Sequence, residues 1–99
     1  MHSTRQNVRN DEYMTLLGRL PREIQEEADV AFRLFEDNPS HPSLRSHPLK
    51  NKGRRHVLGS VSVSINMDYR AVYFVDETTG GNNVWFWIGS HKSFDKEFG

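Results

Sequence analysis

The chain has 99 residues, a net charge of zero at pH 7 and no cysteine, and 35% of its residues are apolar. This length predicts one domain, residues 1–99, and the apolar content favours a folded chain over a disordered one. The lack of cysteine excludes disulfides, thiolate catalysis and thiolate metal sites. Because we find neither an apolar run that could span a membrane nor a secretory signal, we expect a cytoplasmic protein without a membrane partner.

The neutral net charge conceals an uneven distribution along the chain. Residues 38–67 contain five Lys or Arg and no acid, whereas eight acids face five bases before this window and five face three after it. Three histidines lie in the same window. Either a solvated basic loop or an edge that faces the phosphates of a nucleic acid would explain this pattern.

The first part of the chain predicts a hairpin of two helices. Residues 8–19 have one narrow apolar edge and predict a short helix. A second helix is expected to carry Pro21 in its first turn and to stop at Asn38-Pro39. Its apolar residues recur at helical spacing and indicate a buried face: Ile24, Ala28, Ala31 and Phe35.

The rest of the chain predicts a sheet. Residues 38–58 read as a long irregular connection of the kind that often carries function. Residues 60–65 alternate between serine and apolar residues, which predicts a half-buried strand with its serines facing outward. Residues 69–75 and 84–88 are apolar on both faces and predict central strands, and residues 93–98 are expected to form a short helix or a tail.

This order of elements predicts an α+β fold. The N-terminal helical hairpin should pack on one face of a small antiparallel sheet of three or four strands. We expect Trp85, Phe86 and Trp87 to belong to the core, because aromatic side chains in a central strand bury large apolar areas there.

Two polar residues are placed to meet at one end of this sheet. Arg70 lies early in one central strand, and His91 lies just past the next. An arginine that binds a phosphate, beside a histidine that moves a proton, would suit phosphodiester chemistry. Alternatively, Arg70 pairs with Asp68 or Asp95 and His91 is a capping or surface residue.

No other chemistry has a comparable signal in the sequence. The five histidines include no pair at the i, i+4 spacing of a helical metal site, and no HExxH pattern occurs. The chain also lacks the glycine-rich motifs that bind nucleotides. We therefore expect neither a metal site nor a cofactor.

Six short motifs occur in a recognisable order between roughly residues 20 and 95. They are Leu20-Pro21-Arg22-Glu23-Ile24, Asn38-Pro39, His41-Pro42-Ser43-Leu44-Arg45, Pro48-Leu49-Lys50, Asn66-Met67-Asp68-Tyr69-Arg70-Ala71-Val72-Tyr73 and Trp87-Ile88-Gly89-Ser90-His91. The ordered set resembles the RelE/ParE superfamily of toxins from bacterial toxin–antitoxin systems. The resemblance implies a microbial RNase-like fold. For RelE-like members it implies metal-independent cleavage of mRNA on the ribosome, whereas ParE-like members inhibit DNA gyrase.

The resemblance also implies roles for individual residues. Arg70 matches a strand arginine that stabilises the scissile phosphate, and His91 matches a histidine that acts as general acid. His47 lies where a YoeB-like enzyme carries a glutamate base and is the candidate base. The residues expected to bind RNA are Lys50, Lys52, Arg54, Arg55 and Phe94.

Three residues depart from the pattern of the family. Ser62 and Ser64 replace a lysine or arginine of potent ribosome-dependent relatives, and Phe94 replaces a tyrosine. Since serine cannot neutralise charge on a phosphate, a gyrase inhibitor or a decayed toxin kept as an interaction module is the alternative reading. In either case the resemblance implies a cognate antitoxin, whose acidic amphipathic segment would cover the basic loop 45–56 or the groove between helices and sheet.

Overall fold

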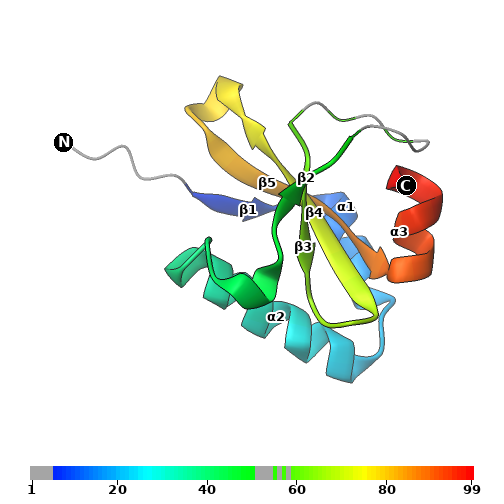
Figure 1. The fold of residues 1–99 in the computed structure, drawn as a ribbon. Coiled ribbons are helices and arrows are strands. Elements are labelled where there is room, and N and C mark those ends of the chain that lie inside the picture. The colour runs from blue at the N-terminus through cyan, green and yellow to red at the C-terminus, as the bar shows by residue number, and fades with distance from the viewer. Residues whose placement is uncertain (1–5, 51–54, 56, 58) are drawn as a thin grey trace.

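The computed structural model describes residues 6–50, 55, 57 and 59–99. Its helices and strands are β1 (Asn7–Arg9), α1 (Asp11–Gly18), α2 (Arg22–Asp37), β2 (His47–Pro48), β3 (Val61–Ser64), β4 (Tyr69–Asp76), β5 (Asn82–Ser90) and α3 (His91–Phe98), with 3₁₀ turns at Pro42–Leu44 and Glu77–Thr79. The sheet has the strand order β1-β5-β4-β3-β2 (Figure 1). None of the helices in the described part of the chain is long and apolar enough to cross a membrane.

The predicted α+β class is confirmed, but the sheet is larger than expected. It has five strands and is mixed, because β1 runs parallel to β5 while the other pairs are antiparallel. The strand β1 overlaps the first two of residues 8–19, which the sequence predicted as helix. The helix begins later because the Asn10 side chain accepts a hydrogen bond from the Tyr13 amide at 2.9 Å and so caps α1. The additional edge strand β2 lies in the connection that was predicted to be irregular.

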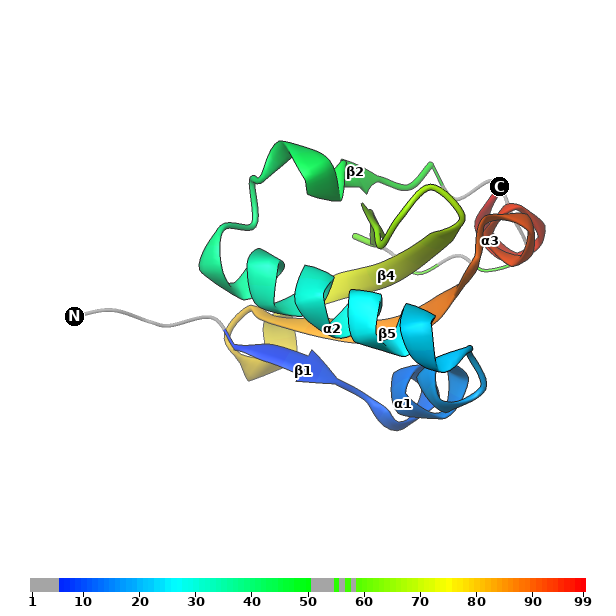
Figure 2. The ribbon, with the colours of Figure 1, turned by 90° about the horizontal axis from the view of Figure 1, so that it is seen from below.

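The two N-terminal helices lie on one face of the sheet, as predicted (Figure 2). Ala28, Ala31 and Phe35 of α2 are buried, whereas Ile24 is only half-buried. Phe32, which the predicted face did not include, completes the buried stripe. Because α2 follows directly after Pro21 and ends before Asn38, its limits agree closely with those expected from these residues.

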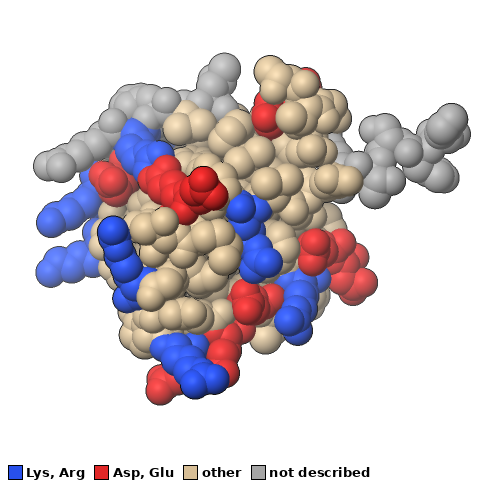
Figure 3. Space-filling model, turned by 180° about the vertical axis from the view of Figure 1, so that it is seen from behind, with Lys and Arg blue, Asp and Glu red and all other residues tan. Residues whose placement is uncertain are grey.

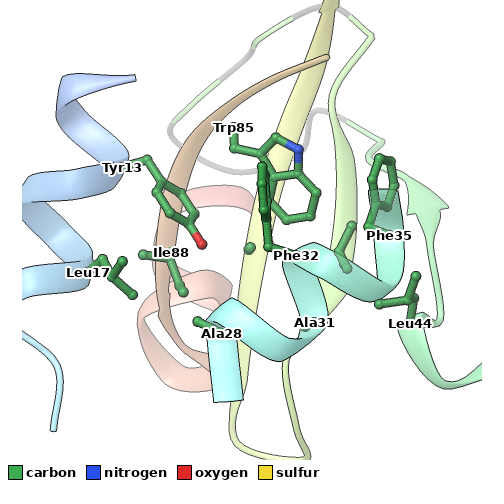
Figure 4. Packing of buried hydrophobic residues seen from close by; sticks show 11 residues of the cluster. Tyr13, Leu17, Ala28, Ala31, Phe32, Phe35, Leu44, Trp85 and Ile88 are labelled. Carbon is green, nitrogen blue, oxygen red and sulfur yellow. The ribbon is translucent and has the colours of Figure 1, made fainter. Parts of the chain in front are cut away.

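Trp85 is the centre of the core under these helices (Figure 4). The side chain is fully buried, and the centroids of four aromatic rings lie 5.0–6.2 Å from it: those of Tyr13, Phe32, Phe35 and Tyr73. Burial raises the pKa of the Tyr13 hydroxyl to about 12, since a phenolate cannot be solvated there. The aromatic residues of α1, α2 and β5 therefore join the hairpin to the sheet through one indole.

A β-bulge in β5 gives the sheet a second core on its opposite face. Val72 pairs with Trp87 and Tyr73 pairs with Trp85, which leaves Phe86 without a partner in β4. Since side chains alternate along a strand, this extra residue shifts the alternation. Phe86 and Trp87 therefore both point away from the α1–α2 face, and they pack with Val72, Phe94 and Phe98 in a separate cluster. The predicted burial of Trp85, Phe86 and Trp87 is confirmed.

The C-terminal segment is a helix rather than a tail, and it covers this second face. The Ser90 hydroxyl accepts a hydrogen bond from the Ser93 amide at 3.1 Å and caps α3. Phe94 and Phe98 lie four residues apart, which places both on one side of α3. Their ring centroids lie 6.1 and 5.3 Å from that of Trp87.

One prediction for β3 is wrong. The serines were expected to face outward into solvent, but Ser60 and Ser62 are 4% and 0% exposed. They do point away from α1 and α2, as the alternation requires. They are buried because the second face is also covered, and Leu49 and Val57 pack against its cluster.

Gly89 offers a test of how closely the second core is packed. A Cβ atom at Gly89 would lie 2.8 Å from the ring of Trp87, which is only 4% exposed. We expect Gly89→Ala to lower the free energy of unfolding by about 1–3 kcal/mol, measured by urea denaturation, because the indole cannot move without disturbing α3. Gly18→Ala is the matched control, since nothing lies within 4 Å of its Cβ position. It should be neutral or raise stability by roughly 0.4–1 kcal/mol. Equal stability of Gly89→Ala and the wild type would contradict this account.

Candidate active site

The candidate residues Arg70 and His47 lie on the second face of the sheet, beside α3. His47 in β2 is paired directly with Ser62 in β3. Arg70 and Val72 of β4 share this face, since they are two residues apart, and Val72 is the partner of Ser62 in the next strand. Three neighbouring strands therefore bring together residues that lie far apart in the sequence.

The Arg70 side chain is held between a hydroxyl and an aromatic ring. Its Nη1 donates a hydrogen bond to Ser62 Oγ at 3.1 Å, and its guanidinium carbon lies 5.5 Å from the centroid of Phe94. Among the described residues, Arg70 has no ion pair with a carboxylate, so the alternative pairing with Asp68 or Asp95 is absent. The positive charge of Arg70 thus remains available for an anion.

His91 is the first residue of α3 and lies near the same ring. Its ring centroid is 6.3 Å from that of Phe94, and its amide donates to the carbonyl of Asp68 at 2.7 Å. The Nδ1 atom lies 3.4 Å from Asp95 Oδ2, and 49% of the side chain is exposed. With Nδ1 directed at a carboxylate, Nε2 is the nitrogen available to a ligand. Arg70 and His91 therefore both lie near Phe94, and the two residues come together at one end of the sheet.

Phe94 itself does not offer an open face to a base. It is 7% exposed and packs against Trp87 and Phe98. Phe94, which was expected to stack on an RNA base, is thus a residue of the core. Because its ring contacts both side chains, we assign Phe94 the role of supporting Arg70 and His91.

His47 is exposed and lies at the edge of the sheet. Its Nδ1 is 3.2 Å from the carbonyl oxygen of Arg45. The hydroxyl of Ser62 lies 3.4 Å from Nδ1 and 3.5 Å from Nε2. Ser62 Oγ therefore lies close to the imidazole of His47 while it accepts a hydrogen bond from Arg70.

Comparison with known proteins gives a consistent result for the fold. No protein-family model and no curated protein matches the sequence. Among solved structures, YafQ from Escherichia coli strain BL21(DE3) matches with a TM-score of 0.69 and 12% identity over 92% of this chain and 98% of its own. A chain of the Escherichia coli DinJ–YafQ toxin–antitoxin complex gives a TM-score of 0.67 and 13% identity, over 90% and 94%. The YoeB/ParE toxin from Agrobacterium tumefaciens gives 0.64 and 19%, over 87% and 98%.

The chain has the fold of the RelE/ParE toxins. The matches cover nearly the whole of each chain, so the helical hairpin, the sheet and α3 all belong to this fold. Within the RelE/ParE fold, Arg70, His47 and Ser62 occupy the sheet face opposite the hairpin, and His91 begins the helix beside it.

The basic residues expected to bind RNA differ in whether the protein already pairs their charge with an acid. Lys50 is exposed, and Lys52 and Arg54 lie outside the described residues. Arg55 is occupied: it donates two hydrogen bonds to the carboxylate of Glu12, at 2.5 and 3.2 Å. This pairing with Glu12 raises the pKa of the Arg55 guanidinium. Arg55 therefore carries a charge that an acid of α1 already neutralises.

The face of the molecule behind the view of Figure 1 carries charges of both signs. Figure 3 shows acids and bases interspersed on it. In the described part of the chain, no three His, Asp or Glu residues are placed to hold a metal ion.

Sequence reasoning missed the part of Ser62 in this candidate site. Ser62 was considered only as the loss of a family cation, whereas the structure places its hydroxyl between Arg70 and His47. The alternation in residues 60–65 did place Ser62 on the face opposite Val61 and Val63. What it did not indicate was the pairing of β2 with β3, which brings His47 to the same hydroxyl.

The contacts of Arg55 predict a structural role for this residue. The guanidinium lies 5.1 and 5.8 Å from the ring centroids of Phe86 and Phe98, in addition to its pairing with Glu12. Arg55→Ala should therefore lower the free energy of unfolding by roughly 1–2 kcal/mol, as measured by urea denaturation. Lys50→Ala, which removes an exposed cation of the same segment, should change stability by less than about 0.5 kcal/mol. An Arg55→Ala variant as stable as Lys50→Ala would show that these contacts contribute nothing.

Proposed function

We propose that this chain is the toxin of a toxin–antitoxin module and that it cleaves mRNA on the ribosome in the bacterial cytoplasm. The observation that carries the proposal is the Arg70 guanidinium, which contacts Ser62 and Phe94 and lacks a carboxylate partner within the described residues. Ser62 also lies near His47, and Phe94 also lies near His91. A guanidinium without a carboxylate partner can bind a phosphate. The imidazoles of His47 and His91 can carry out the proton transfers of phosphodiester cleavage. The likeness to toxins of toxin–antitoxin systems supports the biological setting.

The proposed reaction is metal-independent and needs no cofactor. The ribose 2′-oxygen attacks the adjacent phosphorus, a bond forms between them, and the bond from phosphorus to the 5′-oxygen breaks. The products are a 2′,3′-cyclic phosphate and a free 5′-hydroxyl. Arg70 would stabilise the negative charge that develops on the phosphate oxygens, because a guanidinium donates directional hydrogen bonds to them.

The two histidines would carry the protons. His47, in its neutral form, would take the proton of the 2′-hydroxyl, and protonated His91 would give a proton to the leaving 5′-oxygen. The Asp95 carboxylate near His91 Nδ1 favours this orientation, since it leaves Nε2–H free to donate. Lys50, together with Lys52 and Arg54, would bind the RNA backbone.

The main alternative is a protein that binds its target without cutting it. Ser62 and Ser64 favour this reading, because the sheet beside Arg70 presents hydroxyls rather than further cations. A gyrase-inhibiting toxin of the ParE type, or a decayed toxin retained as an interaction module, would have the same fold.

Expression in bacteria distinguishes these functions. The wild-type chain should arrest growth and translation, with mRNA cut at codon boundaries. Arg70→Ala should reduce cleavage at least about 100-fold, and His47→Ala and His91→Ala should each reduce it by roughly 10²-fold or more. Arg33→Ala, which removes an exposed cation from α2 on the opposite side, should cleave like the wild type.

Two outcomes would contradict a nuclease. One is intact mRNA and equal growth for the wild type and Arg70→Ala. The other is a change in DNA supercoiling together with co-purification of gyrase, which would establish the alternative.

We further propose that a cognate antitoxin binds the groove between α1, α3 and the sheet. This groove has a volume of about 500 Å³. Its lining includes apolar side chains from α1 and the residues after it, Leu16 and Leu20. It also includes two bases and one acid, Arg19, Lys96 and Glu97. Such a lining fits an acidic amphipathic segment, which could also extend over the loop 45–56. Antitoxin complexes of similar structures support this partner class.

The partner proposal can be tested by purification from the native host. A small acidic protein encoded by the adjacent gene should co-purify, and Leu20→Arg together with Lys96→Glu should weaken its binding at least about tenfold. The control is Arg33→Glu, a charge reversal away from this groove, which should leave the affinity unchanged. Isolation of an inactive monomer from a locus without such a neighbour would count against the antitoxin.

A further inference from the structure

A second groove lies between α2 on one side and the 3₁₀ turn 42–44 and the end of β3 on the other. It has a volume of about 620 Å³, and we call it the α2 groove. Its floor is apolar, because Ala31 and Leu44 are buried members of the first core (Figure 4) and Leu34 and Ile65 pack against that core. The α2 groove shares no lining residue with the groove assigned above to the antitoxin.

The rim of the α2 groove is negatively charged. Glu23, Glu26 and Glu27 line it and are exposed, and none of the described residues that line it is basic. In the described part of the chain, none of the three carboxylates forms an ion pair, and Glu27 accepts one hydrogen bond, from the neutral side chain of Asn66 at 3.0 Å. Since Glu23 and Glu27 are four residues apart on the helix, their like charges repel each other until a cation binds.

The α2 groove also exposes an apolar side chain. Val30 is 64% exposed and lines the groove together with the half-buried Leu34. These two residues are four apart and therefore lie on the same side of α2. The side of α2 that borders the groove is thus acidic in its first half and apolar in its second. From Glu23 to Leu34 it extends over ~17 Å of helix.

The sign of the charge decides between classes of partner. Three carboxylates repel the phosphates of a nucleic acid, and they equally repel the acidic segment expected of an antitoxin. A second copy of this chain would have to place a basic surface in the groove of its neighbour. Such a head-to-tail contact extends into rings or filaments rather than a closed pair. The charge and the apolar floor together fit a separate protein whose binding segment is basic at one end and apolar at the other.

We propose that the α2 groove docks a basic amphipathic helix of another protein. Lysine or arginine at one end of that helix would pair with Glu23 and Glu26, while its apolar side covers Val30 and Leu34. A partner helix of about three turns matches the length of the groove. Because α2 and Arg70 lie on opposite faces of the sheet, this partner leaves the candidate active site uncovered. The proposal does not depend on whether the protein cuts RNA.

Binding can be measured with a synthetic helical peptide that carries lysines at one end and leucines along one side. The full chain should increase the fluorescence anisotropy of the labelled peptide, and added salt should weaken this binding. A peptide with glutamate in place of each lysine should bind at least about tenfold more weakly. Equal binding of the two peptides would overturn the proposal.

Matched variants locate the peptide on the protein. Glu23→Gln combined with Glu26→Gln removes two charges at nearly constant size and should weaken binding of the lysine peptide at least about tenfold. Val30→Ser should weaken it about three- to tenfold through lost apolar contact. Glu36→Gln changes an exposed acid of α2 outside this groove, and Val8→Ser changes an exposed valine of β1; both should bind like the wild type. All these changes are at the surface, and circular dichroism checks that each variant is folded.

Three results would assign the α2 groove to something else and overturn the proposal. One is a loss of binding in Glu36→Gln as large as in the double glutamine variant, which would mean attraction to any acid of the surface. Another is displacement of the peptide by a single-stranded RNA oligonucleotide, which would make the groove part of a nucleic-acid surface. The third is self-association of the wild type in sedimentation that the double variant abolishes, which would make a second copy the occupant.

Discussion

The unpaired residue Phe86 in β5 is the constraint on which the arrangement of the molecule depends. Without this bulge, a strictly alternating strand would send Phe86 and Trp87 to opposite faces. The bulge sends both to the face away from the hairpin, while Trp85 and Ile88 remain in the first core. A small sheet thereby gains apolar clusters on both faces. The second cluster holds α3, and α3 in turn places His91 beside Arg70.

The candidate site lies where the second core gives way to polar residues. Val72 and Ser62 are fully buried, yet Arg70 is partly exposed and His47 lies at the sheet edge. A hydrogen bond next to an apolar cluster is stronger than one in water, because the local dielectric constant is lower. The aromatic packing of α3 therefore holds the site in place and also strengthens its polar contacts. The burial of Phe94 in the second core therefore helps to fix the orientation of the Arg70 guanidinium, which contacts its ring.

Much of this arrangement could be predicted from local patterns. The helix α2, the central strands and the meeting of Arg70 with His91 each follow from spacing that a short window of sequence contains. The strand β1 could not be predicted, since three extended residues have no periodicity and their pairing depends on β5, more than 70 residues away. For the same reason the pairing of His47 with Ser62 was missed. The ion pair of Arg55 with Glu12 depends on the tertiary fold, so a run of bases alone could not reveal which of them is neutralised.

The lengths of the outer strands have a consequence for how copies of the protein meet one another. The central strands β4 and β5 have eight and nine residues, but the strands at the sheet edges have only three in β1 and two in β2. Pro48, moreover, has no amide hydrogen to offer to an incoming strand. Short edges of this kind present few unpaired backbone groups in register. Along these two edge strands, a neighbouring molecule thus finds few backbone groups with which to begin an intermolecular ladder.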